Sequence, residues 1–173
     1  MDVSKKEVVS IVNKIKPKPG QESVWDYPRP PAIEKVSKHI RVVFNEEPIL
    51  DTNQSFRILE TSHPPTYYLP KFSFKEGVLL RTKKASFCEF KGMAHYYDLV
   101  FNGKEVKSGA WGYDQPTSPY EALKDHVCLY AQFMDACYIN DERVIPQPGG
   151  FYGGWITNDI VGPFKGESGT WGW

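Results

Sequence analysis

Several groups that can do chemistry stand close together in the segment ETSHPPTYYLP, residues 60–70. Among them are the carboxylate of Glu60 and the imidazole of His63, three positions apart. An imidazole can act as a general acid or base near neutral pH, and a carboxylate can hold it in the required orientation. Ser62 makes a poor nucleophile–base pair with this histidine, because neighbouring residues on an extended chain point apart. The alternative interpretation is a histidine that hydrogen-bonds to the backbone at a turn.

Prolines stiffen the middle of this segment. A proline pushes the preceding residue into an extended conformation, so Pro64 holds the backbone of His63 in a fixed direction. Residues 66–69 then alternate as a strand, which predicts that Tyr67 and Tyr68 point to opposite faces. A rigid segment that presents imidazole and phenol groups is suited to form the wall of a pocket.

Cys88, in the stretch FCEFKG, is a second candidate catalytic group. Lys91 lies three residues further on, and a nearby cation favours the reactive thiolate form of a cysteine. The alternative is a buried strand cysteine, since cysteine is among the residues most often found buried. Lys91 and Arg81 are also candidates to bind an anionic group of a ligand; the alternative is that they are solvated strand ends.

Aromatic side chains provide candidate stacking surfaces. In GAWGYDQP, Trp111 and Tyr113 share one face of an extended segment, where they can line a pocket or pack in the core. Trp25 and Arg29 belong to a proline-rich extended arm, ESVWDYPRPPAIE. The predicted ligand-binding set is Trp25, Arg29, Tyr67, Tyr68, Arg81, Lys91, Trp111 and Tyr113.

Three stretches of the chain share the pattern of a β-hairpin. They are HIRVVFNEEPILD from residue 39, YYDLVFNGKEVKS from residue 96 and CYINDERVIP from residue 137. Their turns centre near Asn45, Asn102-Gly103 and Asn140-Asp141. Asn-Gly between strand-forming runs is a strong hairpin signal, because both central residues must adopt positive φ. Two more strands are expected over residues 78–81 and 86–90, which gives an antiparallel meander of hairpins.

One sizeable α-helix is predicted over residues 118–133. Ser118 is a suitable N-cap, and Pro119 occupies the first helical position. An apolar stripe at helical spacing follows, formed by Leu123, Val127, Tyr130, Met134 and Cys137. Such a stripe is typical of a helix face that packs into the core.

The chain of 173 residues is expected to form one domain, because a chain of this size can bury about 70% of its unfolded surface. Residues 1–20 are predicted to form a short N-terminal helix, capped by Ser4 and ended by Pro17, and then a linker. Residues 147–173 hold eight of the 14 glycines and three of the five tryptophans. This tail is too apolar for a flexible linker. It is predicted to wrap around the body of the domain with its indoles docked.

Composition limits the expected partners and location. Lys+Arg and Asp+Glu both number 21, and a net charge of zero argues against nucleic acid as a partner. No apolar run is long enough to cross a membrane, and the start MDVSKKEVVSIVNK lacks the apolar core of a secretory signal. A cytoplasmic protein with no membrane partner is therefore expected. Its predicted partner is a small molecule, and its predicted state is a monomer or a homodimer.

Neither a metal nor a cofactor is predicted. Cys88, Cys128 and Cys137 form no CxxC pair and are expected to be free thiols. The four histidines lack the spacing of metal ligands: His39, His63, His95 and His126. The phosphate-loop pattern GxxxxGK[ST] is absent from the sequence, and PGGFYGG lacks the strand–turn–helix context that nucleotide loops have.

Seven motifs in the chain match those of a known family. They are VWDYPRPP, RVVFNEEPILDT, RILETSHPPTYYLP, SFCEFKG, AWGYDQP, PQPGGFYGGWIT and GPFKGESGTWGW. Over residues 22–173 the chain resembles the domain of unknown function 427 family. Asp114 departs from the proline that usually follows the family's Trp-x-Tyr motif. The family carries a nucleotidyltransferase-like label, whereas this chain lacks the Gly-Ser motif with paired aspartates that such chemistry would require.

The resemblance implies a mainly β, antiparallel fold of the β-tent kind, similar in architecture to methionine sulfoxide reductase B and to the thalidomide-binding domain of cereblon. Those relatives commonly hold a structural zinc with two CxxC pairs. This chain lacks them, so aromatic side chains must replace the metal. Fold does not fix function. Two hypotheses stay open: a small-molecule-binding domain with an aromatic and histidine-lined pocket, or an enzyme on a small, nucleotide-like substrate with His63 and Glu60, or Cys88, as catalytic groups.

Overall fold

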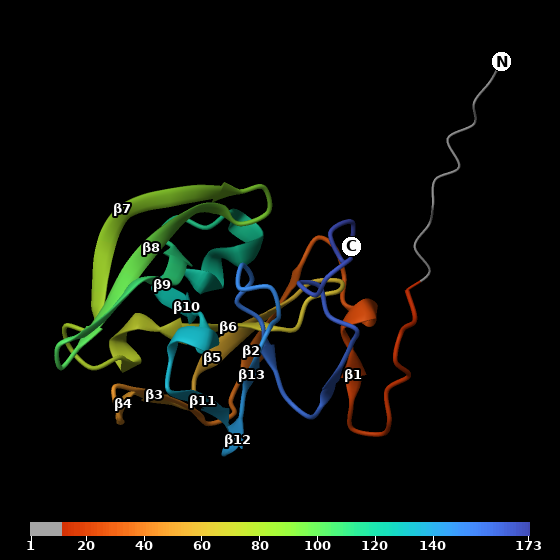
Figure 1. Ribbon diagram of the computed structural model, residues 1–173. Helices are drawn as coiled ribbons and strands as arrows, with labels where there is room; N and C mark the ends of the chain where they lie inside the picture. Colours follow the sequence, from red (N-terminus) through yellow and green to blue (C-terminus); the bar gives the residue numbers. More distant parts are fainter. Residues whose placement is uncertain (1–11) are drawn as a thin grey trace.

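The computed structural model describes residues 12–173, which form a mainly β domain with four short 3₁₀ helices (Figure 1). Its largest sheet has seven strands in the order β2-β5-β6-β10-β9-β8-β7, and every neighbouring pair is antiparallel. The seven strands, in sheet order, are Ala32–Val36, Ser55–Leu59, Thr66–Pro70, His126–Leu129, Lys104–Tyr113, Gly92–Phe101 and Leu79–Cys88. The fold is therefore mainly β and antiparallel, as the sequence predicts.

A second sheet of four strands has the order β12-β11-β3-β4. Its strands are Glu142–Arg143, Ala136–Ile139, Ile40–Phe44 and Glu47–Thr52. Two small sheets complete the domain: β1 (Glu22–Ser23) pairs in parallel with β15 (Ile160–Val161), and β13 (Ile145–Pro146) pairs with β14 (Trp155–Ile156). The 3₁₀ helices are η1 Val24–Asp26, η2 Lys71–Ser73, η3 Ser118–Leu123 and η4 Ala131–Phe133.

The three predicted hairpin turns are confirmed. They join β3 to β4, β8 to β9 and β11 to β12, and both central residues of each turn have positive φ. For the first turn φ is 51° at Asn45 and 69° at Glu46. This backbone matches the right-handed twist of the flanking strands, which explains why asparagine stands first in all three turns.

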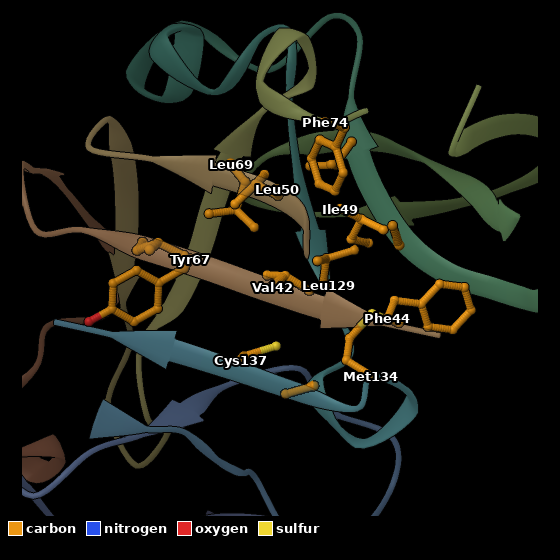
Figure 2. Close-up of a cluster of buried hydrophobic side chains, with 14 of the residues drawn as sticks. Val42, Phe44, Ile49, Leu50, Tyr67, Leu69, Phe74, Leu129, Met134 and Cys137 are labelled. Carbon is orange, nitrogen blue, oxygen red and sulfur yellow. The ribbon is translucent and has the colours of Figure 1, made fainter. Parts of the chain in front are cut away.

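The main hydrophobic core lies between the two large sheets (Figure 2). Side chains of the seven-stranded sheet, such as Tyr67 and Leu69, meet Val42, Phe44 and Cys137 from the four-stranded sheet. Tyr68 instead belongs to a second cluster on the opposite face of the seven-stranded sheet. The predicted alternation along residues 66–69 is thus confirmed.

Two register shifts bend the long strands of the seven-stranded sheet. One lies between Arg81 and Ala85 in β7, and the other between Tyr97 and Leu99 in β8. The first falls inside one continuous strand, where the sequence predicts two. Bulges of this kind bend a strand and increase its twist. Figure 1 shows β7 and β8 curving away from the layer that contains β3, β4 and β11.

The predicted helix over residues 118–133 is wrong. Only Ser118–Leu123 and Ala131–Phe133 are helical, both of the 3₁₀ type, and β10 lies between them. The helical path ends at Lys124, whose ψ is 141°, and at Asp125, whose φ is +61°. Strand β10 fills the place between β6 and β9, so backbone pairing with distant segments outweighs the local capping signals. Of the apolar stripe, all but the half-buried Tyr130 are buried.

The N-terminal helix prediction falls mostly on residues 1–11, which lie outside the described residues. Residues 12–17 are described and are not helical. No helix of the described part, residues 12–173, is long and apolar enough to cross a membrane.

The glycine-rich tail follows β13, runs along the body of the domain and contains β14 and β15. Trp155 is 1% exposed, and its Nε1–H donates to the carbonyl of Leu129 over 3.2 Å. Trp173 packs edge-on against Trp25, with 5.1 Å between ring centroids. Trp171 does not dock: it is 90% exposed, which corrects the prediction that the indoles of the tail dock on the body of the domain.

Candidate functional site

A cleft of about 690 Å³ opens on the outer face of the seven-stranded sheet, opposite the main core. Side chains of β5 to β9 line it, together with the turn at residues 60–63, the region around η4 and the tail at residues 147–153. The tail lies very close to the sheet here. A Cβ atom on Gly153 would stand 2.1 Å from Cη2 of Trp111, so only glycine fits at this contact.

A tight turn brings Glu60 and His63 together at one end of the cleft. The backbone N–H of His63 donates to the carbonyl of Glu60 over 3.0 Å, and Ser62 between them has φ of +73°. His63 Nε2 then lies 3.1 Å from Glu60 Oε2. The predicted proximity of carboxylate and imidazole is therefore present.

Ser62 is strained and fully buried. Glycine or asparagine normally occupies a turn position with positive φ, and another residue there costs about 1–3 kcal/mol. The Ser62 hydroxyl has no hydrogen-bond partner among residues 12–173. Its backbone is held from both sides, by the carbonyl of Val24 and by the N–H of Lys165. The N-terminal arm and the tail thus fix the turn that carries Glu60 and His63.

Gln147 determines which ring nitrogen of His63 carries hydrogen. Its Oε1 accepts the N–H of Gly154 over 3.0 Å, which places Nε2 on the other side of the amide. Nε2 donates to the carbonyl of Lys165 over 2.8 Å and to His63 Nδ1 over 3.1 Å. An amide nitrogen can only donate, so Nδ1 accepts and the neutral ring carries its hydrogen on Nε2, toward Glu60.

Both ring nitrogens of His63 are thereby occupied within the protein. Gln147 takes the lone pair of Nδ1, and Nε2 faces Glu60. The side chain of Glu60 is 24% exposed and lines the cleft, and a carboxylate has about four lone-pair positions. Within this pair, Glu60 has the capacity to meet a ligand, and His63 holds it in position.

Glu60 is an anion near neutral pH. Burial raises its pKa, but the contact with His63 and the positive charges of Lys91 and Arg29 outweigh this effect. The net pKa of Glu60 lies below its ordinary value. An ionised carboxylate accepts hydrogen bonds and does not donate them, so Glu60 selects for N–H or O–H groups.

Cys88, at the end of β7, is partly exposed and lines the same cleft. The other two cysteines, Cys128 and Cys137, are buried, and burial raises the pKa of both thiols. Within residues 12–173 no group of three or more His, Cys, Asp or Glu side chains is arranged to hold a metal ion.

Six of the predicted site residues line the cleft: Glu60, His63, Cys88, Lys91, Trp111 and Tyr113. Lys91 lies over the ring of Tyr113, with 5.8 Å from Nζ to the ring centroid. Trp111 packs against Tyr130 with ring centroids 4.7 Å apart. Three different segments of the chain supply these six residues, so the sequence motifs converge on one place.

Five predicted ligand-binding residues lie elsewhere. Trp25 donates to the carbonyl of Pro163 and packs on Trp173. The exposed Arg29 donates to the carbonyl of Thr61 over 2.9 Å. Both sit outside the cleft, because the proline-rich arm packs against the tail and the back of the turn.

Tyr67, Tyr68 and Arg81 are also outside the cleft lining. Tyr67 stacks on Trp155 in the main core, because its strand position faces the second sheet. Tyr68 faces the cleft side but is 1% exposed, since it is covered by its own cluster. Arg81 forms an ion pair with Asp114 at the far side of the bulge in β7.

Several cleft residues are missing from the sequence-based set. Lys84 stands four positions before Cys88 on one strand, so the period of two would have found it. Tyr130 and Phe133 also line the cleft, but the predicted helix assigned their segment to the core. Gln147 had no local signal: its role depends on partners 7 to 84 residues away in the sequence.

The sequence profile of the family described as Domain of unknown function (DUF427) matches residues 32–140. No curated protein matches the chain. The matched segment contains Glu60, His63 and Cys88, and it ends before Gln147 and the tail that closes the cleft. The chain therefore belongs to the DUF427 family.

Proposed function

We propose that this protein is a small-molecule-binding β domain whose ligand occupies the cleft on the outer face of the seven-stranded sheet. The single observation that carries the proposal is convergence: a fixed carboxylate, a thiol, lysines and aromatic rings from distant segments line one hollow of about 690 Å³. Ligand sites are typically hollows of about 300–1,000 Å³ with apolar walls and a few oriented polar groups.

The geometry of the turn favours a site that binds over one that transfers protons. A general base needs a lone pair that is free toward its substrate. His63 uses Nδ1 to accept from Gln147, and Nε2 faces Glu60. The lowered pKa of Glu60 makes its carboxylate a weak base and keeps it in the ionised form that accepts hydrogen bonds. Strain at Ser62 is consistent with a turn kept for its position at the site.

An enzyme is the second candidate, and one observation favours it. Cys88 is the partly exposed thiol among the three cysteines, and it lines the cleft with Glu60 and Lys91. A thiol that a bound ligand can reach is a candidate nucleophile. Under this alternative His63 and Glu60, or Cys88, would act on the same small molecule that the cleft binds.

A thermal-shift screen of metabolites tests the proposal, on wild type, Glu60→Gln and the control Glu89→Gln. Glu89 is exposed and adjacent to Cys88 but does not line the cleft. A ligand at a hundred times its Kd stabilises by about 2.7 kcal/mol, which raises the Tm by roughly 5–10 °C in a domain of this size. At least one compound should produce such a shift in wild type and control, and a smaller one in Glu60→Gln.

No stabilising compound, or an equal shift in all three proteins, would contradict the cleft as the site. The same hits, incubated with the protein and followed by mass spectrometry, separate the two functions. Unchanged compound supports binding alone. Turnover that Cys88→Ser or Glu60→Gln abolishes would replace the binding proposal with the enzyme.

A further inference from the structure

Resting on the function proposed above, we infer that the ligand is a planar aromatic compound that carries a phosphate monoester. Two features of the cleft lead to this class: two lysines that have no carboxylate partner in the part of the chain that the structure describes, and exposed phenyl rings. Neither feature is needed to stabilise the fold, because the side chains concerned are partly or fully exposed.

The charge of the cleft differs from that of the whole chain. Basic and acidic residues are balanced at 21 each over the sequence. Among residues 12–173, however, the cleft is lined by a single carboxylate, that of Glu60, and by four lysines: Lys84, Lys91, Lys107 and Lys165. A hollow with excess positive charge raises the local concentration of anions.

Two of these lysines are already engaged. Lys107 pairs with Asp98 and Glu105, at 3.4 and 2.6 Å. Lys165 Nζ donates to the carbonyl of Trp173 over 2.7 Å. They contribute charge to the cleft but have less capacity left for a ligand.

Lys84 and Lys91 have no carboxylate within 4.0 Å among residues 12–173. Each ammonium lies over a tyrosine ring instead: Lys84 is 4.5 Å from the centroid of Tyr96, and Lys91 is 5.8 Å from that of Tyr113. A ring face attracts a cation but accepts few of the hydrogen bonds that an ammonium group can donate. Two such ammonium groups match the charge of about −1.5 to −2 that a phosphate monoester carries near pH 7.

The apolar part of the ligand class follows from two exposed rings. Phe133, in η4, is 45% exposed, and Phe151, in the tail, is 76% exposed. Both line the cleft, from segments that are far apart in the chain. Tyr130 lies beside Phe133, with ring centroids 5.9 Å apart. Exposed aromatic faces gain most from a planar ring that stacks on them.

Calorimetric titration tests this assignment with probes that distinguish the contribution of the aromatic ring to binding from that of the phosphate. The probes are the 5′-monophosphates of adenosine, guanosine, cytidine and uridine, 4-nitrophenyl phosphate, adenosine and inorganic phosphate. At least one monoester should bind wild type more tightly than adenosine and inorganic phosphate do. Its affinity should fall as salt is raised, because the contact is electrostatic.

Matched variants show which side chain binds the phosphate and which binds the aromatic ring of the ligand. Lys84→Gln should weaken the best monoester by about three- to tenfold, whereas Lys83→Gln, with the same change of charge, should not. Lys83 is the neighbour of Lys84 on β7 and does not line the cleft. Phe133→Ala should weaken it by about two- to tenfold, whereas Phe87→Ala should not. Phe87 is 74% exposed on the same strand as Cys88 but outside the cleft.

Three results would overturn the assignment: no monoester binds, adenosine binds as well as its monophosphate, or inorganic phosphate binds as well as the esters. Equal losses in Lys83→Gln and Lys84→Gln would also overturn it. The proposed binding function is tested separately from the identity of the ligand. Neutral compounds from the metabolite screen that depend on Glu60 would leave that function intact while they refute the phosphate ester.

Discussion

The two faces of the seven-stranded sheet are built from the same strands but differ in what they contact. Tyr67 and Leu69 point into the main core, whereas Tyr68 between them points to the opposite face. In β10, Val127 and Leu129 face the core, and Cys128 faces the other side. The core face is covered by a second sheet; the outer face is only partly covered and opens into the cleft. Alternation along each strand therefore separates the residues that stabilise the fold from those available to a ligand.

The two faces also differ in how their polar groups are arranged. The main core is a cluster of apolar and aromatic side chains from both large sheets. The cleft combines Glu60, His63, Cys88 and lysines with aromatic rings. Substitutions on the core face should mainly lower stability, and those at exposed positions of the cleft should mainly alter binding. The following predictions test this division, in order of the expected change in stability.

Leu69→Ala should have the largest effect on stability. Leu69 is fully buried between the sheets, and removing such a side chain typically costs about 2–5 kcal/mol. Ser86→Ala, at an exposed cleft position, should change stability by less than about 0.5 kcal/mol. Urea unfolding measures both. Similar losses in the two variants would break the division between the faces.

Gln147→Leu should lower the free energy of unfolding by about 1–3 kcal/mol. The side chain is 3% exposed, and the change leaves the buried N–H of Gly154 and partly buried groups of His63 and Lys165 without their partner. Gln115→Leu, at an exposed position, is the control and should be near neutral. Nitrogen NMR of His63 should show hydrogen on Nε2 in the wild type. Hydrogen on Nδ1 would contradict the role assigned to Gln147.

Glu60→Gln should remove a pH-dependent contribution to the free energy of unfolding, on the order of 1 kcal/mol. The pKa of Glu60 is lower in the folded protein, so its ionised form stabilises the fold above the unfolded pKa of about 4.3. That contribution is lost as the pH falls through the folded pKa. The stability difference between wild type and variant should therefore shrink between about pH 6 and pH 3. A stability difference that grows on acidification would contradict the lowered pKa of Glu60 in the folded protein.

Cys88→Ser should change stability least, by under about 0.5 kcal/mol, because the thiol is partly exposed. Its effect should appear in thiol labelling instead. In the native wild type one cysteine should react readily, and that reaction should disappear in the variant. Cys128 and Cys137 are 1% and 2% exposed and should react only after unfolding. Equal native labelling rates for all three thiols would show that the cleft does not expose Cys88 selectively.

The parts of the fold that depend on neighbouring residues could be predicted from the sequence. The hairpin turn at Asn102-Gly103 requires positive φ at two adjacent positions, and the local residue types meet that requirement. The alternation of Tyr67 and Tyr68 follows in the same way from the geometry of a strand. The approach of Glu60 to His63 was also local, since one turn sets it.

The parts that depend on distant partners could not be predicted. Residues 118–133 carry the capping signals of a helix, but strand pairing with β6 and β9 fixes β10 within that range. Arg81 appeared available to a ligand, and Asp114 across the sheet neutralises it. Gln147 belongs to the motif PQPGGFYGGWIT, but the motif does not reveal its contacts with the distant His63 and Lys165.

Indole N–H NMR during a ligand titration tests the central claim most directly, with the compound that stabilises most in the metabolite screen. Trp111 lines the cleft, and Trp155 lies in the core at 1% exposure, so the two indoles report on the two faces. The account predicts a saturable shift of the Trp111 resonance and an unchanged Trp155 resonance. Two results would contradict the assignment of the cleft as the binding site: a shift of the Trp155 resonance without one of Trp111, or no shift of either resonance.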